Sequence, residues 1–334
     1  MIPGPVAVVG AGSWGTALAI SLARSGGAVR LWDRGAAQVA MLSVDRENRA
    51  YLPGHRLPNN VSPVAALPVA VSGAAMVVLA VPSAALSSLV PAVAEATDPG
   101  ADWVLATKGL DPETLETPSA TVRRLLGAAA RSVVSLSGPN LAREVAAGIP
   151  TAAVAASPDA AAAERVARRC NQPSFRTYVS NDIVGVETGG AVKNVLAIAA
   201  GVSDGLGFGD NTKAALLTRG LGEMARLSEA LGGRRETVYG LAGVGDLMAT
   251  ASSRLSRNWR VGEGLALGRG VAEVLADIAQ VAEGIPTARA VARLAEGHGL
   301  ALPVCAAVDD LLAGRITPVD ALARLTENRM AGRE

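Results

Sequence analysis

The sequence has few of the residues that build disulfide scaffolds, metal centres and aromatic cores. Its 334 residues include two cysteines, Cys170 and Cys305, two histidines, His55 and His298, and only 3% aromatic residues. Two distant cysteines do not form a disulfide framework, and two distant histidines argue against a histidine triad or a zinc site. We therefore expect no metal, and two reduced core cysteines in a cytoplasmic protein.

Charge is also scarce, and neither sign dominates. Charged residues make up 18% of the chain, and 31 basic against 30 acidic residues give a net charge of +1. Without a basic surplus we expect no nucleic-acid partner, so any bound anion must be held by local charge. The chain starts without a basic, cleavable leader and has no charge-free apolar run of about 20 residues, so we expect no membrane insertion.

Apolar residues, in contrast, make up half of the chain, largely as Ala, Val and Leu. Such small side chains let helices and strands pack closely around a sizeable core. At about 150 residues per domain, the length indicates two domains.

Short apolar runs alternate with helical stretches in the first half of the chain. Examples are residues 6–9, 28–32, 76–81 and 103–106, none of which shows polar alternation. Such strands are typical of a sheet covered on both faces, so we expect a parallel, doubly wound sheet with ligands at the carboxyl ends of its strands. The irregular segment 46–63 is interpreted as a surface loop that borders the site.

Strand-like runs stop near residue 180, and only helical stretches follow. This shift predicts an α/β domain over residues 1–180 and an all-α domain over residues 181–334.

A glycine motif, Gly10-Ala11-Gly12-Ser13-Trp14-Gly15, follows the first run and opens a helix, with a second strand after it. In this context GxGxxG predicts a dinucleotide site, so the domain over residues 1–180 is expected to be Rossmann-like and dinucleotide-binding, which leaves substrate binding and catalysis to the helical domain over residues 181–334. Gly10 would permit the tight turn, Gly12 the approach of a pyrophosphate, and Gly15 close packing of helix and strand. The free N–H groups of the helix would bind the anion.

The second strand ends in Asp33-Arg34, which gives a mixed signal for the cofactor. An acid at this point binds the ribose hydroxyls of NAD, whereas an arginine accommodates the 2′-phosphate of NADP. NAD and NADP therefore both remain open, and either side chain could also be a solvated charge.

Lys193 and Asn194 stand in an otherwise apolar helical run after Gly189-Gly190. A buried ammonium costs several kcal/mol unless it is paired. Lys193 either extends its ammonium to the surface or serves chemistry. Asp246, in Gly243-Val244-Gly245-Asp246-Leu247, is either a helix cap or its partner.

Other polar groups stand at element ends. Lys108 and the segment Gly138 to Asn140 each follow a strand, which places them on the same edge of the sheet as the glycine motif. Ser256-Arg257-Asn258 opens a helix and combines a hydroxyl, a guanidinium, an amide and free N–H groups. It predicts a phosphate site, the alternative being an ordinary serine N-cap.

Taken together and in order, these segments resemble the NAD(P)-dependent glycerol-3-phosphate dehydrogenases of bacteria, and more distantly the soluble eukaryotic enzymes. The resemblance runs nearly end to end. It is carried by Gly10 to Ala19, Ala106 to Leu110, Ser137 to Glu144, Gly189 to Asn194, Gly209 to Gly220, Gly243 to Leu247, and Ser256 to Asn258.

The resemblance implies reversible reduction of dihydroxyacetone phosphate to sn-glycerol 3-phosphate for glycerophospholipid synthesis, with no metal. It implies that Lys193 is the general acid/base and that Asp246 orients it. Asn140 departs from the family pattern, in which a hydroxyl residue is common at this position. The implied substrate contacts are Lys108, Gly138, Asn140, Lys193, Asp246, Ser256, Arg257 and Asn258.

The resemblance also implies NAD or NADP as cofactor and a homodimer as the assembly. Together with the glycines of the motif, the implied cofactor contacts are Ser13, Trp14, Arg34, Lys108, Ala142, Arg257, Val281 and Glu283.

Two other functions compete with this one. A β-hydroxyacid or 6-phosphogluconate dehydrogenase also combines a Rossmann domain with a helical lysine and asparagine, but the Ser-Arg-Asn and Gly-Asp-Leu segments argue against it. A nucleotide-sensing protein without catalysis would have no use for a buried lysine such as Lys193.

Overall fold

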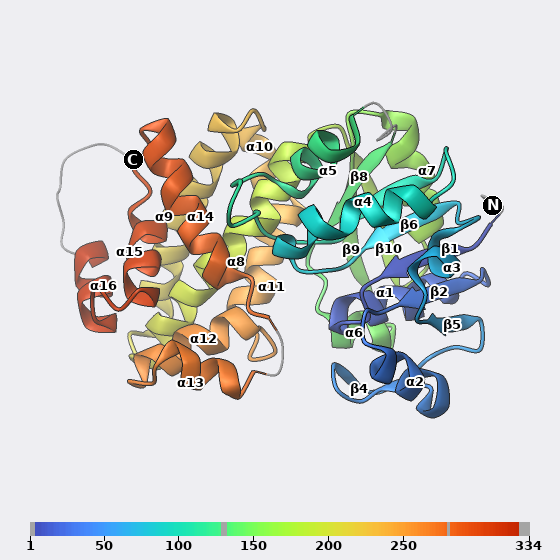
Figure 1. Cartoon of the computed structure of the whole chain (residues 1–334). Helices are drawn as coiled ribbons and strands as arrows, with labels where there is room; N and C mark the ends of the chain where they lie inside the picture. The colour runs from blue at the N-terminus through green and yellow to red at the C-terminus, as the bar shows by residue number, and fades with distance from the viewer. Residues whose placement is uncertain (1–3, 128–131, 279–280, 327–334) are drawn as a thin grey trace.

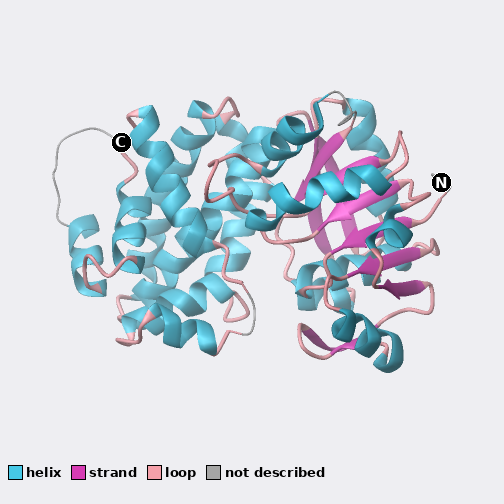
Figure 2. Cartoon of the chain, in the orientation of Figure 1, coloured by secondary structure: helices cyan, strands magenta, loops and turns pink. Residues whose placement is uncertain are grey.

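The computed structural model describes residues 4–127, 132–278 and 281–326. It contains a Rossmann-like α/β domain followed by an all-α domain, as the sequence predicts (Figures 1 and 2). In Figure 1 the sheet and the amino end of the chain lie on the right, and the late helices lie on the left. The long helix α8 (Ile183–Gly205) lies where the two domains meet.

Ten strands are present in the described residues. They are β1 (Val6–Val9), β2 (Val29–Trp32), β3 (Glu47–Asn48), β4 (Leu52–Arg56), β5 (Val61–Val64), β6 (Met76–Leu79), β7 (Asp102–Leu105), β8 (Val133–Ser137), β9 (Thr151–Ala156) and β10 (Phe175–Ser180). Eight of them form one sheet in the order β10-β9-β8-β7-β6-β1-β2-β5, and β3 and β4 form a separate antiparallel hairpin.

The sheet is covered on both faces, because successive side chains of a strand point to opposite sides. Val6 and Val8 of β1 enter one hydrophobic cluster, and Ala7 and Val9 enter the other. A third cluster fills the helical domain. Both faces of the sheet are therefore buried, which explains why these strands show no polar alternation.

The expectation of a wholly parallel sheet is wrong at one end. The β8–β9 pair is antiparallel, whereas β9 and β10 are parallel to each other. An antiparallel neighbour starts at the edge where the previous strand ends, so the chain from Gly138 to Pro150 need not cross the sheet. The sequence does not reveal this reversal of direction, because the alanine-rich run of β9 is equally apolar in a parallel and in an antiparallel strand.

The interpretation of residues 46–63 as a surface loop is also wrong. This segment contains the β3–β4 hairpin and the start of β5, which is an edge strand of the main sheet. Pro63 obscures the strand pattern, but proline is tolerated on an edge strand because one side of that strand has no hydrogen-bonding partner.

The helices of the first domain lie over the sheet faces; for example, α4 and α5 are seen in front of it in Figure 1. They are α1 (Ser13–Ala23), α2 (Ala36–Asp45), α3 (Leu67–Val71), the 3₁₀ turn η1 (Ser83–Ala85), α4 (Leu86–Ala96), α5 (Pro118–Leu126), α6 (Ala142–Ala147) and α7 (Ala160–Cys170).

The second domain packs its helices around α8. After α8 come α9 (Gly209–Ala230), α10 (Arg235–Val238), a π-helical turn (Leu241–Gly245), α11 (Asp246–Ala251), α12 (Arg257–Ala266), α13 (Val271–Ala276), α14 (Gly284–His298), α15 (Pro303–Leu312) and α16 (Pro318–Thr326).

Helix α8 is buried along nearly its whole length, and all residues from Gly185 to Ser203 are buried. Glycines allow neighbouring backbones to approach it. A Cβ atom at Gly201 would lie 2.0 Å from Trp259 O, and one at Gly262 would lie 2.0 Å from Ile198 O, so α8 and α12 pack through glycines. This close packing explains how a chain poor in aromatics builds its core.

By length and composition, α8 is the one described helix that could cross a membrane. In the structure, 94% of its apolar window is buried inside the protein. Its hydrophobicity is thus used within the core, as in other buried helices.

Candidate active site

The glycine motif forms a tight turn between β1 and α1. Gly10 has φ +110, and a Cβ atom there would lie 2.6 Å from Ala80 O, so only glycine fits. A Cβ atom at Gly15 would lie 1.8 Å from Gly10 O, whereas a Cβ atom at Gly12 would have no atom within 4 Å. The turn is therefore closed against the protein and open at Gly12, as a pyrophosphate site requires.

Side chains from outside the motif also contact this turn. Asp33 accepts hydrogen bonds from the N–H of Ala11 at 3.1 Å and of Gly35 at 2.9 Å. Ser13 donates its hydroxyl to Tyr51 O at 2.6 Å. Arg34 is exposed, and it forms no hydrogen bond or ion pair within the described residues.

Lys193 does not reach solvent. Its side chain is on α8, the residue is 7% exposed, and its Nζ lies 3.1 Å from Asp246 Oδ1. The same Nζ donates to Thr250 Oγ1 at 2.8 Å, and the Thr250 hydroxyl is 3.2 Å from Asp246 Oδ1. The alternative in which the lysine extends to the surface is excluded, and Asp246 is its partner.

Lys108 reaches the same carboxylate from the sheet domain. Its Nζ lies 2.6 Å from Asp246 Oδ2 and donates to Gly138 O at 3.0 Å. Lys108, Gly138, Lys193 and Asp246 are thus brought together by the ends of β7 and β8, by α8 and by α11. The prediction that Lys108 and Gly138 share one edge of the sheet is confirmed.

The charges of this cluster act on one another. Burial is the main cause that lowers the pKa of Lys193 to about 8; Asp246 opposes this shift, and Lys108 and Arg257 add to it. Burial by itself would raise the pKa of Asp246, but Lys108 and Lys193 outweigh it and hold that pKa below its ordinary value. A lysine that titrates near neutral pH next to a permanent carboxylate suits proton transfer.

The Ser256-Arg257-Asn258 segment begins α12. The Ser256 hydroxyl accepts a hydrogen bond from Trp259 N–H at 3.2 Å, so this serine is an N-cap. Asn258 donates to Asn194 Oδ1 at 2.8 Å and accepts from Gly284 N–H at 3.0 Å. The serine N-cap is therefore present, while the phosphate site at this segment stays a prediction.

Arg257 forms no hydrogen bond or ion pair with any described residue. Burial lowers the pKa of its guanidinium, and the charge of Glu283 opposes that shift. Burial likewise raises the pKa of the Glu283 carboxyl, whose Oε2 accepts from the Ser83 hydroxyl at 3.0 Å. A desolvated cation without a partner, at a helix start, is suited to binding an anion.

The remaining predicted residues are not joined to the lysine cluster by any hydrogen bond or ion pair in the described chain. Asn140 donates to Thr151 Oγ1 and Ala152 O, both at 3.0 Å, while its buried Oδ1 has no partner. Val281 is exposed. Trp14 and Ala142 are partly buried against the core under the sheet, and Trp14 Nε1 has no partner.

Ser83 and Asn48 also contact predicted site residues, although no sequence pattern above identifies them. Ser83 follows a strand, the same signal that identifies Lys108, and it contacts Glu283 200 positions away. Asn48 contacts the glycine turn from the hairpin and carries no comparable signal. Gly189 and Gly190 allow close packing of α8, since Cβ atoms there would lie 3.0 Å from Ala242 O and 2.9 Å from Ser137 Oγ.

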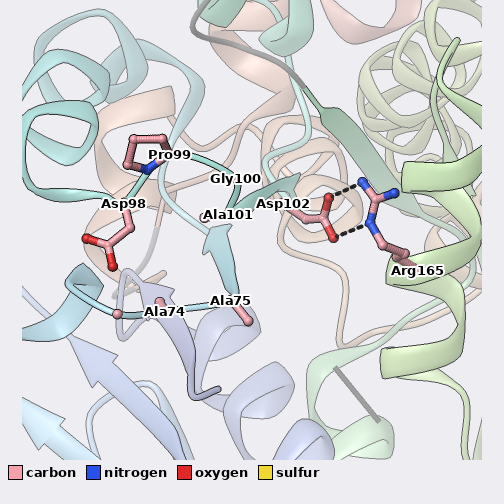
Figure 3. A pocket seen from close by; sticks show the side chains of 9 residues that line it. Ala74, Ala75, Asp98, Pro99, Gly100, Ala101, Asp102 and Arg165 are labelled. Carbon is pink, nitrogen blue, oxygen red and sulfur yellow. Dashed lines mark hydrogen bonds and ion pairs between the residues drawn. The ribbon is translucent and has the colours of Figure 1, made fainter. Parts of the chain in front are cut away.

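A hollow of about 300 Å³ lies elsewhere, at the amino ends of β6 and β7 (Figure 3). Its main polar feature is Asp102, which is bound by Arg165 at 2.7 Å and by the Ser132 hydroxyl at 2.8 Å. Because ligands of such sheets bind at the carboxyl ends of the strands, we do not assign the active site there. No group of three or more potential metal ligands occurs among residues 4–127, 132–278 and 281–326.

A Rossmann-like domain with an open glycine turn, followed by a helical domain that holds a buried lysine on a carboxylate, defines a dinucleotide-dependent dehydrogenase. Comparison with known proteins agrees. A family model for the N-terminus of NAD-dependent glycerol-3-phosphate dehydrogenase matches residues 5–163, and the model for its C-terminus matches residues 182–323. The chain belongs to this family, and it is an oxidoreductase that uses NAD or NADP.

Individual relatives cover almost the whole chain. The glycerol-3-phosphate dehydrogenase [NAD(P)+] of Aromatoleum aromaticum is 48% identical over 92% of this chain and 93% of its own. That of Xanthomonas euvesicatoria is 44% identical over 96% and 94%. The crystal structure of the enzyme from Coxiella burnetii superposes with a TM-score of 0.93 at 37% identity, covering 98% of this chain and all of the other.

Proposed function

We propose that this dehydrogenase reduces dihydroxyacetone phosphate to sn-glycerol 3-phosphate, reversibly and with NADH or NADPH, using Lys193 as its general acid and base. Family membership supports the reaction. The observation that supports the role of Lys193 is its buried ammonium, 3.1 Å from Asp246 Oδ1 and with a pKa of about 8. The product is the backbone of glycerophospholipids.

When bound, the nicotinamide supplies the hydride that reduces the C2 carbonyl. As negative charge develops on the carbonyl oxygen, Lys193 donates a proton from its ammonium, and in the reverse direction its neutral amine removes the hydroxyl proton. Asp246 and Thr250 hold Nζ in place through bonds of 3.1 and 2.8 Å. Because the site is buried, these charges interact strongly and need little reorganisation during the reaction.

Lys108, Gly138 and Asn140 are proposed to bind the reacting end of the substrate. Lys108 adds positive potential where negative charge gathers, and it already lies 2.6 Å from Asp246. Asn140 has both amide hydrogens engaged, so only its unpartnered Oδ1 is available, and it can accept a bond from a substrate hydroxyl.

The phosphate is proposed to bind at Ser256, Arg257 and Asn258. Arg257 supplies the charge, because it is desolvated and has no partner in the described residues. The Ser256 side chain already caps α12, and the Asn258 side chain already bonds Asn194. These two residues would therefore contribute mainly by positioning Arg257 and through their backbone N–H groups. Binding energy at the phosphate then positions the carbonyl for reaction.

The dinucleotide is proposed to lie along the glycine turn, whose open side at Gly12 fits a pyrophosphate. Ser13 and Trp14 would bind it through backbone N–H groups at the start of α1, since the Ser13 hydroxyl is bound to Tyr51 O. Arg34 is free to bind a 2′-phosphate, while Asp33 is held by two backbone groups. The other proposed contacts are Lys108, Ala142, Arg257, Val281 and Glu283.

We further propose that residues 1–180 hold the dinucleotide and that residues 181–334 supply the acid/base and the phosphate site. The last strand ends at Ser180 and α8 begins at Ile183, which supports this division. The protein is proposed to be cytoplasmic and homodimeric, without nucleic-acid partners or membrane insertion. The burial of α8 in the core supports the last point.

The test is steady-state reduction of dihydroxyacetone phosphate with NADH and with NADPH in parallel, alongside a β-hydroxyacid and 6-phosphogluconate in the oxidative direction. We expect turnover of dihydroxyacetone phosphate only. Turnover of a hydroxyacid alone would establish the alternative dehydrogenase, and dinucleotide binding without any turnover would establish a sensing protein.

A further inference from the structure

We propose that Asn48 is a positioning residue of the dinucleotide site, fixing the glycine turn in the shape that presents its N–H groups to the cofactor. The inference rests on the proposed cofactor site. It concerns the β3–β4 hairpin, which has no role in the mechanism described above.

Asn48 is fully buried, with 0% of its surface exposed, and its side-chain amide is completely used. Its Nδ2 donates to Ala11 O and to Thr16 Oγ1, both at 2.8 Å. Its Oδ1 accepts from Gln38 Nε2 at 2.8 Å and from Tyr51 N–H at 3.2 Å. A buried amide with both hydrogens and its oxygen bound holds one orientation.

The two donated bonds reach the centre of the motif. Ala11 stands between Gly10 and Gly12, and Asp33 accepts a hydrogen bond from its N–H. Its C=O accepts from Asn48 at 2.8 Å and, at a longer 3.4 Å, from the Thr16 hydroxyl, which Asn48 itself contacts. The peptide bond is planar and trans, so the C=O of Ala11 and the N–H of Gly12 point in opposite directions. By holding the C=O, Asn48 also sets the direction of the Gly12 N–H.

That direction matters because glycine constrains its own backbone weakly. No side-chain cap bonds the start of α1, and the space around Gly12 is open. Without Asn48, only the long bond from the Thr16 hydroxyl would hold the Ala11 C=O. The peptide between Ala11 and Gly12 would then rotate more easily, and the turn would have to be reordered on binding. Ordering of this kind reduces affinity.

The hairpin is tied to the turn by a second bond, from the Ser13 hydroxyl to Tyr51 O at 2.6 Å. The β3–β4 hairpin and α2 therefore support the cofactor turn from the side. This arrangement predicts a loss of dinucleotide affinity, and not of chemistry, when Asn48 is changed.

The chain provides a matched control in Asn60. This asparagine also bonds α1 and the segment after it, through Ala23 O and Gly27 O, both at 2.8 Å. These bonds lie at the other end of the helix from the motif. Asn60→Ala thus removes two comparable bonds without touching the turn.

The experiment measures the Kd of NADH and NADPH by fluorescence titration, together with kcat, the KM of dihydroxyacetone phosphate and the Tm. For Asn48→Ala we expect Kd to rise at least tenfold, while kcat at saturating cofactor and the substrate KM stay within about twofold. For Asn60→Ala we expect a smaller loss of Tm, because Asn60 makes two side-chain bonds and Asn48 makes four, with both Kd values within about twofold of wild type.

Gln38→Ala provides a milder variant in case Asn48→Ala does not fold, since it removes only one bond to Asn48 Oδ1. We expect it to raise Kd by about two- to fivefold. An unchanged Kd in Asn48→Ala, or in Gln38→Ala if Asn48→Ala does not fold, would overturn the inference alone, as would an equal rise of Kd in Asn60→Ala. A wild-type chain that binds neither dinucleotide would overturn the proposed function as well.

Discussion

Lys108 and Asp246 are 138 positions apart in the chain, yet Lys108 Nζ lies 2.6 Å from Asp246 Oδ2. This ion pair joins the edge of the sheet to the helical domain, and the other carboxylate oxygen of Asp246 lies 3.1 Å from Lys193 Nζ. One buried carboxylate thus sets the separation of two lysines. The charge balance of this trio determines the pH dependence predicted below.

Lys193→Ala is expected to lower kcat for dihydroxyacetone phosphate to below a few per cent of wild type. General acid/base groups contribute about 10²–10⁴-fold, and no other described side chain occupies the same position. The Kd of NADH, measured by titration, should stay within about twofold. Lys213→Ala is the matched control, because Lys213 also pairs with an aspartate, Asp204, at 2.9 Å but away from the cluster. A variant at position 193 that retains appreciable turnover would place the acid/base elsewhere.

The pH dependence follows from the Lys193 pKa of about 8 in the free protein. Carbonyl reduction needs the ammonium, so kcat/KM for reduction should fall as pH rises through about 8. Alcohol oxidation needs the neutral amine, so its kcat/KM should rise through the same range. Both limbs are measured with steady-state rates between pH 6 and 10.

The two neighbours of Lys193 should move these limbs in opposite directions. Asp246 raises the pKa of Lys193, so Asp246→Asn should shift both limbs to lower pH. Lys108 lowers that pKa, so Lys108→Met should shift them to higher pH, whatever happens to the absolute rates. If the pH dependence of kcat/KM is unchanged in both variants, the titrating group is not Lys193.

Arg257→Ala is expected to reduce the contribution of the substrate phosphate to kcat/KM. A hydrogen bond to a charged group contributes about 1.5–3 kcal/mol, which corresponds to roughly 10–150-fold in kcat/KM. The ratio of kcat/KM for dihydroxyacetone phosphate to kcat/KM for dihydroxyacetone should decrease by this factor. Arg254 provides the control, because its guanidinium carbon lies 5.7 Å from the centroid of the Trp259 ring. Arg254→Ala should leave the ratio unchanged. An unchanged ratio in Arg257→Ala would move the phosphate site elsewhere.

Glu187 links α8 to the sheet domain and should affect both stability and turnover. Its buried carboxylate accepts from Ser119 N–H at 3.0 Å, from the Ser119 hydroxyl at 2.7 Å and from the Ser135 hydroxyl. These donors belong to the start of α5 and to β8, the strand that leads to Gly138. Glu187→Gln disturbs several bonds, each worth about 1 kcal/mol, and it should lower kcat at least tenfold because small displacements of reacting groups are costly.

The control for this prediction is Glu223, a second buried carboxylate that binds the start of a helix. It accepts from Val304 N–H at 2.7 Å and from Cys305 N–H at 2.9 Å, within the helical domain. Glu223→Gln should lower the free energy of unfolding, measured by chemical denaturation, by a similar amount of about 1–3 kcal/mol, while kcat stays within about twofold. Equal losses of kcat in the two variants would show that Glu187 acts only through stability.

Local sequence patterns predict most elements of the sheet domain, but not their directions or edges. The run that forms β9, Thr151–Ala156, is identified as a strand, yet its antiparallel pairing with β8 depends on where the chain returns after Gly138. Likewise, β5 escapes prediction because Pro63 interrupts the pattern of an edge strand. Strand existence is a local property, whereas pairing is a property of the whole sheet.

By itself, the sequence determined the two-part architecture, the glycine turn, the helix that carries Lys193 and the family, because each depends on residues close together in the chain or on segments in a fixed order. Only the tertiary structure decided that Lys108 and Lys193 share Asp246, that Arg257 is left without a partner, and that Asn48 holds Ala11. These contacts join residues 37 to 138 positions apart, and no local periodicity records which side chains meet when distant elements pack.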